Sequence, residues 1–298
     1  MTDAPDGDAV AASLARDWGL RAPTIERHDR GMNSRTWIIT DGARRWVAKA
    51  VPADVQPSFA AGLAVASLVD AAGIPSGAPE PTRSGALSVV LGRWTLALLR
   101  FADGEPLVGD DEREQRLIGL TLARAHRALR GREVPGAERF HWIDAEASHL
   151  DIEPWVRPAV RAAIGAYDAI HPHELTWGLL HSDPAPEAFL CDARTDRCGL
   201  IDWGTALVGP LMYDVASAVM YVGGRRYAST LLDAYLAERV IPASEVERAL
   251  EPMLQLRWAV QADYFARRLA TDDLTGIANS DENQVGLDDA RRGLLGSS

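Results

Sequence analysis

The sequence predicts an α+β fold with two lobes, a small β-sheet lobe followed by a larger and mostly helical lobe. Short apolar runs with strand-like composition recur in the first hundred residues, and from residue 111 onward longer segments carry apolar side chains at helical spacing. The 298 residues suffice for two hydrophobic cores, and 47% hydrophobic with 24% charged residues is typical of a globular protein.

Strands are the main expected elements of the small lobe, residues 1–102. Apolar runs bounded by turn residues predict strands at 24–28, 31–39 (entered through a glycine-containing turn), 45–51, 87–91 and 94–100. Helices are expected at 9–18 and 58–72, because a glycine follows each segment as a stop signal. Residues 1–8 have the composition of a disordered tail.

Helices are the main expected elements of the large lobe, residues 103–298. Periodic apolar residues predict helices at 111–129, 154–170, 214–222 and 227–237, with one or two more within 242–268. His126, near the end of the first of these, is interpreted as core support. The acidic stretch 272–289 is rich in turn signals. The histidines lack the spacing of a zinc site, so no zinc site is expected.

One stretch, from Gly178 to Gly204, carries the pattern from which we predict chemistry. Leu179-Leu180 runs into His181-Ser182-Asp183, and Leu200-Ile201 runs into Asp202. The polar segment 192–197 predicts a hairpin turn, which would bring Asp183 and Asp202 to one cleft. Two carboxylates with different neighbours can divide the work, one accepting a proton and the other holding a metal ion. Phosphoryl transfer needs such a pair, because its catalysis is mostly positioning and neutralisation of phosphate charge.

The ordered motifs of this stretch resemble the catalytic and metal-binding loops of the aminoglycoside phosphotransferase group, small-molecule kinases with a protein-kinase-like fold. His181-Ser182-Asp183 is similar to the His-Gly-Asp loop of that group, and Ile201-Asp202-Trp203 to its Ile-Asp-Trp metal loop. Residues 209–217 resemble its Gly-Asp-Pro-x-x-Asp-Leu-Ala segment. The resemblance implies a bilobal protein-kinase-like fold with a small N-terminal sheet lobe and a larger helical C-terminal lobe.

The resemblance assigns roles to the loop residues. Asp183 would accept or orient the proton of a substrate hydroxyl as it attacks the γ-phosphate in line, and Asp202 would ligate Mg²⁺. Ala188 stands where the family has a metal-binding Asn, so Glu187 is the candidate for a further metal ligand. Asp214 would brace the catalytic loop from the start of a helix.

Nucleotide contacts follow from the same resemblance. The candidates are Ser34, Arg35, Lys49, Arg100, Phe101 and Ala102. Lys49 would contact the α- and β-phosphates of ATP or GTP, and Ser34 and Arg35 would approach the phosphates from a loop. The last three candidates would form the interlobe hinge beside the purine. The helix Glu that pairs with this lysine in the family is replaced by Gly62. Either another group orients Lys49, or the lysine is less constrained.

The acceptor is expected to be a cationic small molecule. A net charge of -11 argues against nucleic acid and anionic membranes as partners, although it also fits a general solubility effect. No long activation segment follows Asp202, which disfavours a protein kinase. We therefore predict phosphorylation of a cationic antibiotic, an aminoglycoside or a capreomycin-type cyclic peptide, which would confer resistance. Candidate amine contacts, also typical of solvated surface charge, are Asp151, Glu153, Asp263, Asp272 and Asp273.

Two alternatives stay open. One is a metabolic kinase of choline, of a homoserine-like amino alcohol or of a sugar, which a neutral or anionic acceptor would distinguish. The other is a weak or inactive kinase-fold protein that sequesters its ligand, because the expected Asn and Glu are both missing.

A cytoplasmic monomer or homodimer is expected. The N-terminus lacks a basic region followed by an apolar core, and no apolar run is long enough to span a bilayer. Cys191 and Cys198 flank the predicted hairpin turn and could lie near each other, but reduced thiols are expected in a cytosolic enzyme.

Overall fold

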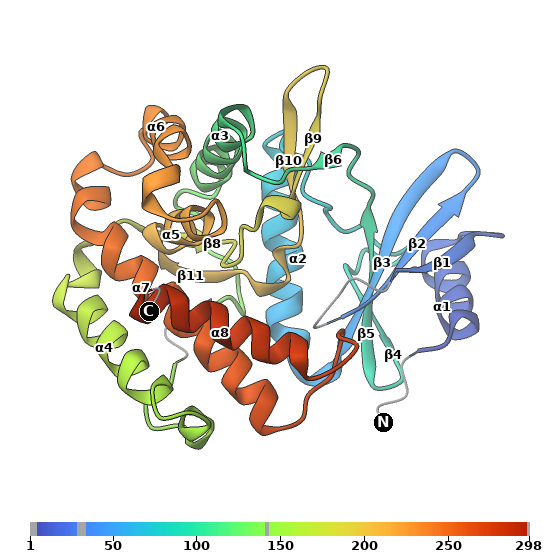
Figure 1. The fold of residues 1–298 in the computed structure, drawn as a ribbon. Helices are drawn as coiled ribbons and strands as arrows, with labels where there is room; N and C mark the ends of the chain where they lie inside the picture. Colours follow the sequence, from blue (N-terminus) through green and yellow to red (C-terminus); the bar gives the residue numbers. More distant parts are fainter. Residues whose placement is uncertain (1–4, 29–33, 141–142, 297–298) are drawn as a thin grey trace. The chain divides into compact units, whose positions relative to one another are not determined.

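The fold is that of a computed structural model, which describes residues 5–28, 34–140 and 143–296 (Figure 1). The glycine-containing turn expected before the second strand falls mostly outside these residues. The chain forms two compact units. The sheet unit comprises Met1–Leu107, Gly131–Glu138 and Glu187–Ala206, and the helical unit comprises Val108–Arg130, Arg139–Pro186 and Leu207–Ser298. Each unit is discontinuous in sequence.

The sheet unit is built on a 5-stranded antiparallel sheet with the order β1-β2-β3-β5-β4. Its strands are β1 (Thr24–His28), β2 (Arg35–Asp41), β3 (Arg44–Pro52), β4 (Val89–Leu91) and β5 (Trp94–Arg100). Their apolar runs form strands because alternate side chains can be buried on the two faces of the sheet. The strands predicted from the sequence are therefore confirmed, with small shifts at their ends.

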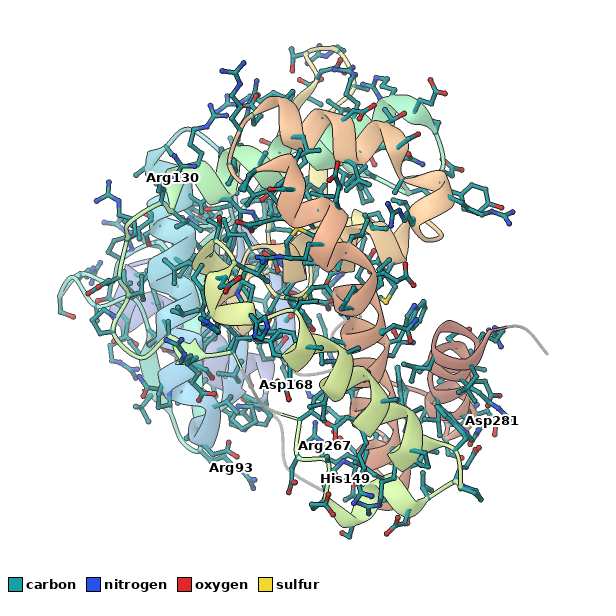
Figure 2. All side chains as sticks on the ribbon, turned by 90° about the vertical axis from the view of Figure 1, so that its left-hand side faces the viewer. Arg93, Arg130, His149, Asp168, Arg267 and Asp281 are labelled. Atoms are coloured by element: carbon teal, nitrogen blue, oxygen red, sulfur yellow. A yellow bond between two sulfur atoms is a disulfide. The ribbon has the colours of Figure 1, made fainter. Side chains whose placement is uncertain are left out.

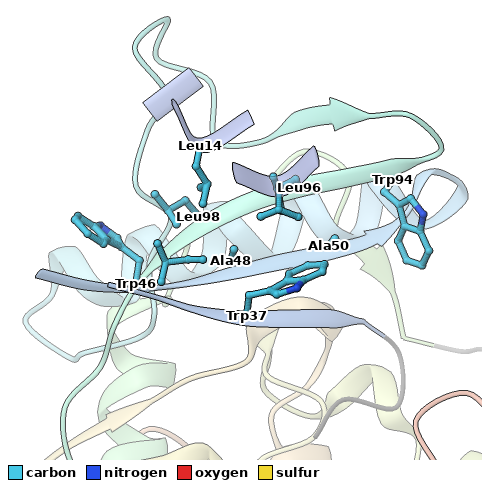
Figure 3. Close-up of a cluster of buried hydrophobic side chains, with 10 residues drawn as sticks. Leu14, Trp37, Trp46, Ala48, Ala50, Trp94, Leu96 and Leu98 are labelled. Carbon is cyan, nitrogen blue, oxygen red and sulfur yellow. The ribbon is translucent and has the colours of Figure 1, made fainter. Parts of the chain in front are cut away.

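Helices cover both faces of this sheet. Trp37, Ala48 and Leu96 pack on one face against α1 (Gly7–Ser13) and the π-helical turn Leu14–Trp18 that follows it (Figure 3). The opposite face packs against α2 (Gln56–Ala71), whose Phe59 and Leu63 contact Val51 and Ala97. Burying one such large apolar side chain contributes about 1.5–3 kcal/mol to folding, so each face of the sheet is held by its own cluster.

A second, smaller sheet of the same unit has the order β10-β9-β6. It contains β6 (Glu105–Pro106), β9 (Phe189–Asp192) and β10 (Arg197–Leu200), so the predicted hairpin around residues 192–197 is confirmed. Cys191 and Cys198 are directly opposite each other in the β9–β10 register and form a disulfide. The expectation of reduced thiols is corrected here: antiparallel pairing places the two Cα atoms 4.1 Å apart, close enough for a bond.

The helical unit contains the remaining long helices. They are α3 (Glu112–Ala128), α4 (Val156–Ala169), α5 (Met212–Tyr221), α6 (Ser229–Ala237), α7 (Ala243–Ala270) and α8 (Asp281–Leu295). Helix α3 packs with α6, and α7 packs with α4, α5 and α8. Strands β8 (Trp177–Leu180) and β11 (Leu207–Pro210) pair antiparallel, in a sheet whose third strand is β7 (Glu138–Arg139).

The segment 242–268, expected to hold one or two helices, is the single helix α7, which continues through Pro252, so this prediction is confirmed. One helical prediction needs correction. The acidic stretch 272–289 was expected to be turn-rich, but from Asp281 onward it belongs to α8, where Leu287 and Ala290 are buried. Within the described ranges, no helix combines the length and apolarity that crossing a membrane requires.

Candidate active site

The loop after β8 is fixed by one buried carboxylate. Asp214, in the first turn of α5, accepts hydrogen bonds from the backbone N–H of His181 at 2.7 Å and of Ser182 at 2.8 Å. Its side chain is fully buried. The predicted brace is therefore confirmed. Ser182 occupies the glycine position of the resembling motif and adopts φ 72°, a left-handed conformation that glycine favours.

Buried polar groups hold Asp214 itself. The Nε2 atom of His126 lies 3.0 Å from Asp214 Oδ2, and its Nδ1 atom lies 2.8 Å from the hydroxyl of Tyr235. Both ring nitrogens of this buried histidine are therefore engaged within the core. This confirms the interpretation of His126 as core support.

The side chain of Asp183 emerges from the braced loop. It is 54% exposed, and its Oδ1 atom accepts hydrogen bonds from the hydroxyl of Tyr221 at 2.5 Å and from Arg257 at 3.0 Å. Arg257 also donates to the Tyr221 hydroxyl at 2.9 Å. Neither partner was predicted from the sequence, because each lies in an ordinary helix and no motif marks it. Asp183 thus combines solvent access with a defined orientation.

The sheet unit brings together two other predicted residues, Lys49 and Asp202. The ammonium group of Lys49, on β3, donates a hydrogen bond to Asp202 Oδ1 and forms an ion pair with it. Asp202 follows Ile201, the first residue after β10, and has φ 66°. Its side chain is 60% exposed, whereas that of Lys49 is 16% exposed. A carboxylate and a lysine so placed can hold phosphate and metal charges together.

The missing helix Glu has a structural explanation. Gly62 of α2 faces the backbone of Trp203, and a Cβ atom there would lie 2.3 Å from the Trp203 carbonyl oxygen. No side chain fits at that position without moving the backbone that follows Asp202. The alternative that another group orients Lys49 therefore holds in this fold, and the group is Asp202.

The other nucleotide candidates lie around the large sheet. Arg35 is paired with Ala50, which belongs to the cluster under α1, so the Arg35 side chain lies on the α1 face of the sheet. Lys49 is paired with Thr36 and Ala97, and its side chain lies on the opposite face. Arg35 and Lys49 therefore leave opposite faces of the sheet. Ser34 precedes β2 directly.

The expected hinge follows β5. Arg100 forms an ion pair with Asp70 at 3.0 Å, and its N–H donates to the Ala78 carbonyl. The guanidinium of Arg45 stacks on the ring of Phe101 at 3.6 Å, and Ala102 continues in irregular backbone. The chain is thus held at Arg100 and at Phe101.

The metal candidates are few. Glu187 is exposed in the 3-10 turn Pro186–Ala188, and the Ala188 carbonyl accepts the N–H of Ile201 at 2.9 Å. Among the residues described, no three His, Cys, Asp or Glu side chains cluster as a metal site would require. A metal bound through Asp202 would complete its shell with water and phosphate oxygens, which is how Mg²⁺ is usually held.

Most of the acidic acceptor candidates already have partners within the helical unit. Asp151 pairs with Arg157 at 2.7 Å, Asp263 with His149 at 2.7 Å and Asp273 with Arg268 at 3.2 Å. Glu153 accepts hydrogen bonds from Trp155 and Gln284. Asp272 is exposed. The hydrogen bond from Arg157 lowers the pKa of Asp151. These pairs use charge that would otherwise attract a cationic ligand.

The chain resembles known proteins over most of its length. A sequence model described as the phosphotransferase enzyme family matches residues 24–251. The homoserine kinase of Rhodospirillum rubrum is 30% identical over 273 residues, which covers 85% of this chain and 82% of that protein.

Solved structures share the fold. An amicoumacin kinase in complex with AMP-PNP, Ca²⁺ and Ami has a TM-score of 0.75 at 13% identity, covering 98% of this chain and 94% of its own. A microcompartment-associated aminopropanol kinase has a TM-score of 0.70 at 16% identity, covering 96% and 95%. The predicted protein-kinase-like fold is confirmed. The chain belongs to the phosphotransferase enzyme family, and it is a kinase whose acceptor is an alcohol group.

Proposed function

We propose that the enzyme transfers the γ-phosphate of a nucleoside triphosphate to the hydroxyl of a small amino alcohol of the homoserine type. The observation that carries the reaction is the exposed Asp183 carboxylate on a loop whose backbone is anchored by the buried Asp214. Such a carboxylate can orient a hydroxyl and accept its proton, while phosphate charge is neutralised elsewhere in the site.

The charged groups of the sheet unit serve the nucleotide phosphates. Lys49 binds the α- and β-phosphates, and a magnesium ion held by Asp202, with Glu187 as a further oxygen donor, would supply the charge neutralisation that transfer requires. Ser34 and Arg35 contribute from the start of β2; since the Arg35 side chain lies on the α1 face, its backbone is the part assigned to the phosphates.

Two further assignments, one for the purine and one for the acceptor, complete the proposal. The backbone at Arg100, Phe101 and Ala102 hydrogen-bonds the purine edge of ATP or GTP, in the manner the family resemblance implies. The acceptor oxygen attacks in line, and its proton passes to Asp183.

A small acceptor is favoured over a polycation by the state of the acidic residues. Asp151, Asp263 and Asp273 are each paired with a basic side chain, so little unpaired acidic charge is contributed by these candidates. The homoserine kinase relative, matched over most of its length, supports the same class.

A cationic antibiotic is the second candidate. The net charge of -11 and the exposed Asp272 favour a cationic ligand, and the fold neighbour with the TM-score of 0.75 is a kinase bound to an antibiotic. An enzyme of this kind would confer resistance on its host.

The deciding experiment measures phosphate transfer from ATP and from GTP with Mg²⁺, detecting the product by mass. The acceptor panel contains homoserine, choline, aminopropanol, a neutral sugar, aminoglycosides and capreomycin. We expect a gain of one phosphate on an amino alcohol, and a loss of about 10²–10⁴-fold in kcat for Asp183→Asn with ligand binding retained.

Asp168→Asn, an exposed substitution on α4 (Figure 2), is the matched control and should leave kcat unchanged. Transfer only to an antibiotic would establish the second candidate. Binding without transfer across the panel would instead indicate a protein that sequesters its ligand.

A further inference from the structure

Two side chains from different helices meet at one oxygen of Asp183. Tyr221 is the last residue of α5, and Arg257 lies in the middle of α7. Both donate to Asp183 Oδ1, at 2.5 and 3.0 Å, and Arg257 also donates to the Tyr221 hydroxyl at 2.9 Å. The three groups therefore form a closed triangle of hydrogen bonds around one carboxylate oxygen.

The other oxygen of this carboxylate is differently placed. Across the parts of the chain that the structure describes, Asp183 Oδ2 accepts no hydrogen bond, and the side chain is 54% exposed. A carboxylate held through one oxygen loses the freedom to rotate about its terminal torsion. The free oxygen consequently has a fixed direction.

Arg257 is an unusual residue to find buried. Its side chain is only 9% exposed, and its Nε atom is one of the buried donors without a partner among the described residues. Burial alone lowers the pKa of Arg257, but Tyr213, Tyr221 and Asp183 outweigh that effect and raise it. A buried cation with an unsatisfied donor costs folding stability, so its retention beside Asp183 points to a role in the reaction.

We infer that Arg257 and Tyr221 are positioning residues, which fix Asp183 so that Oδ2 alone faces the acceptor hydroxyl. This inference rests on the proposed function. The acceptor O–H bond breaks as its proton passes to Oδ2, a new bond forms between the acceptor oxygen and the γ-phosphorus, and the bond to the departing nucleoside diphosphate breaks. Such a transfer depends more on orientation than on a strong base, which is why a fixed carboxylate beside a cation is adequate.

The test compares Arg257→Gln, Arg257→Lys and Tyr221→Phe with the wild-type enzyme. We expect Arg257→Gln to lower kcat by about 10²-fold, because an error of about 1 Å in a reacting group costs that much, while the KM values for nucleotide and acceptor stay within about twofold. Arg257→Lys keeps the charge without the planar fork and should be intermediate. Tyr221→Phe removes one of two donors and should lower kcat by about tenfold.

The decisive measurement places Arg257→Gln in the Asp183→Asn background. If Arg257 acts through Asp183, the double variant has the same kcat as Asp183→Asn alone. Arg248→Gln is the matched control: it removes the same charge from the same helix and an ion pair of 2.8 Å with Glu174, and should leave kcat unchanged.

Several outcomes would overturn the inference. A wild-type kcat in Arg257→Gln, or equal losses in both backgrounds, would show that Arg257 does not act through Asp183. A raised acceptor KM at constant kcat would make Arg257 a substrate-binding residue instead. If Arg257→Gln fails to fold, as circular dichroism would reveal, Arg257→Lys and Tyr221→Phe decide by the same criteria. Absence of transfer by the wild-type enzyme would overturn the proposed function together with this inference, whereas the other outcomes leave the function standing.

Discussion

At the scale of single residues, Asp214 determines where the loop that carries the proposed catalytic residue Asp183 lies. Its carboxylate receives the N–H groups of His181 and Ser182 and contacts His126, all without access to solvent. Hydrogen bonds to a buried charge are worth more than neutral ones, and a donor left without its acceptor costs its full desolvation energy. The position of Asp183 therefore depends on a residue that has no part in the chemistry itself.

Asp214→Asn should weaken both the fold and the reaction. An amide keeps one acceptor oxygen but turns its NH₂ group toward a backbone N–H, so we expect a loss of about 2 kcal/mol in the free energy of unfolding. Urea denaturation measures this loss, and kcat measured on the folded fraction should fall as well. An unchanged kcat would mean that the loop keeps its conformation without this anchor.

At the scale of elements, helix α2 and the segment after β10 pack closely against each other. Gly62 lets the Trp203 backbone approach α2, and Trp203 is further fixed by its indole N–H, which donates to the Leu200 carbonyl at 2.7 Å. The contact holds the residue next to Asp202, which pairs with Lys49. A glycine in mid-helix costs stability, and here it is explained by close packing.

Gly62→Ala should therefore destabilise the protein, although alanine is the better helix former. Overpacking against the Trp203 carbonyl costs about 1–3 kcal/mol and displaces Asp202, so the KM for metal-nucleotide should rise. Gly165→Ala is the matched control in α4, where a Cβ atom meets nothing within 4 Å.

The control substitution should stabilise the protein by about 0.4–1 kcal/mol. Chemical denaturation of the two variants compares them directly. Equal stabilisation by both would contradict the close contact between α2 and Trp203.

At the scale of the whole molecule, the predicted chemistry is divided between the two units. Lys49 and Asp202 belong to the sheet unit, whereas Asp183, Tyr221 and Arg257 belong to the helical unit. Within each unit the charged groups are held by contacts internal to that unit. We therefore expect the local effects of nucleotide binding to be concentrated in the sheet unit of the intact protein.

ATP with Mg²⁺ should stabilise the protein and slow amide exchange mainly in the sheet unit. A ligand at 100 times its Kd adds about 2.7 kcal/mol to the free energy of unfolding by mass action. Thermal shift measures the total effect, and hydrogen–deuterium exchange with peptide resolution locates it. Lys49→Ala should abolish most of the stabilisation. Protection confined to the helical unit would contradict the assignment of Lys49 to the phosphates.

Much of the fold was predictable from local patterns. The strands of the large sheet were predicted because their alternation of buried side chains is a property of consecutive residues, and helix 111–129 because its apolar face repeats at helical spacing. The turn-rich interpretation of 272–289 was wrong at α8, because Leu287 and Ala290 are buried by packing against α7, which the acidic local sequence does not indicate.

Asp183, Asp202 and Lys49 were predicted as site residues because ordered motifs carry them, and these roles stay predictions. The bracing role of Asp214 was predicted in the same way and is confirmed. Local sequence patterns are enough to predict the order of the strands and helices along the chain and the residue types available for phosphoryl transfer. Three pairings become visible only in the folded chain: Arg257 with Asp183, 74 residues away, Asp202 with Lys49 in place of a helix Glu, and Cys191 with Cys198. Such pairings arise from long-range packing, whose energy depends on surfaces that meet only after the elements have formed.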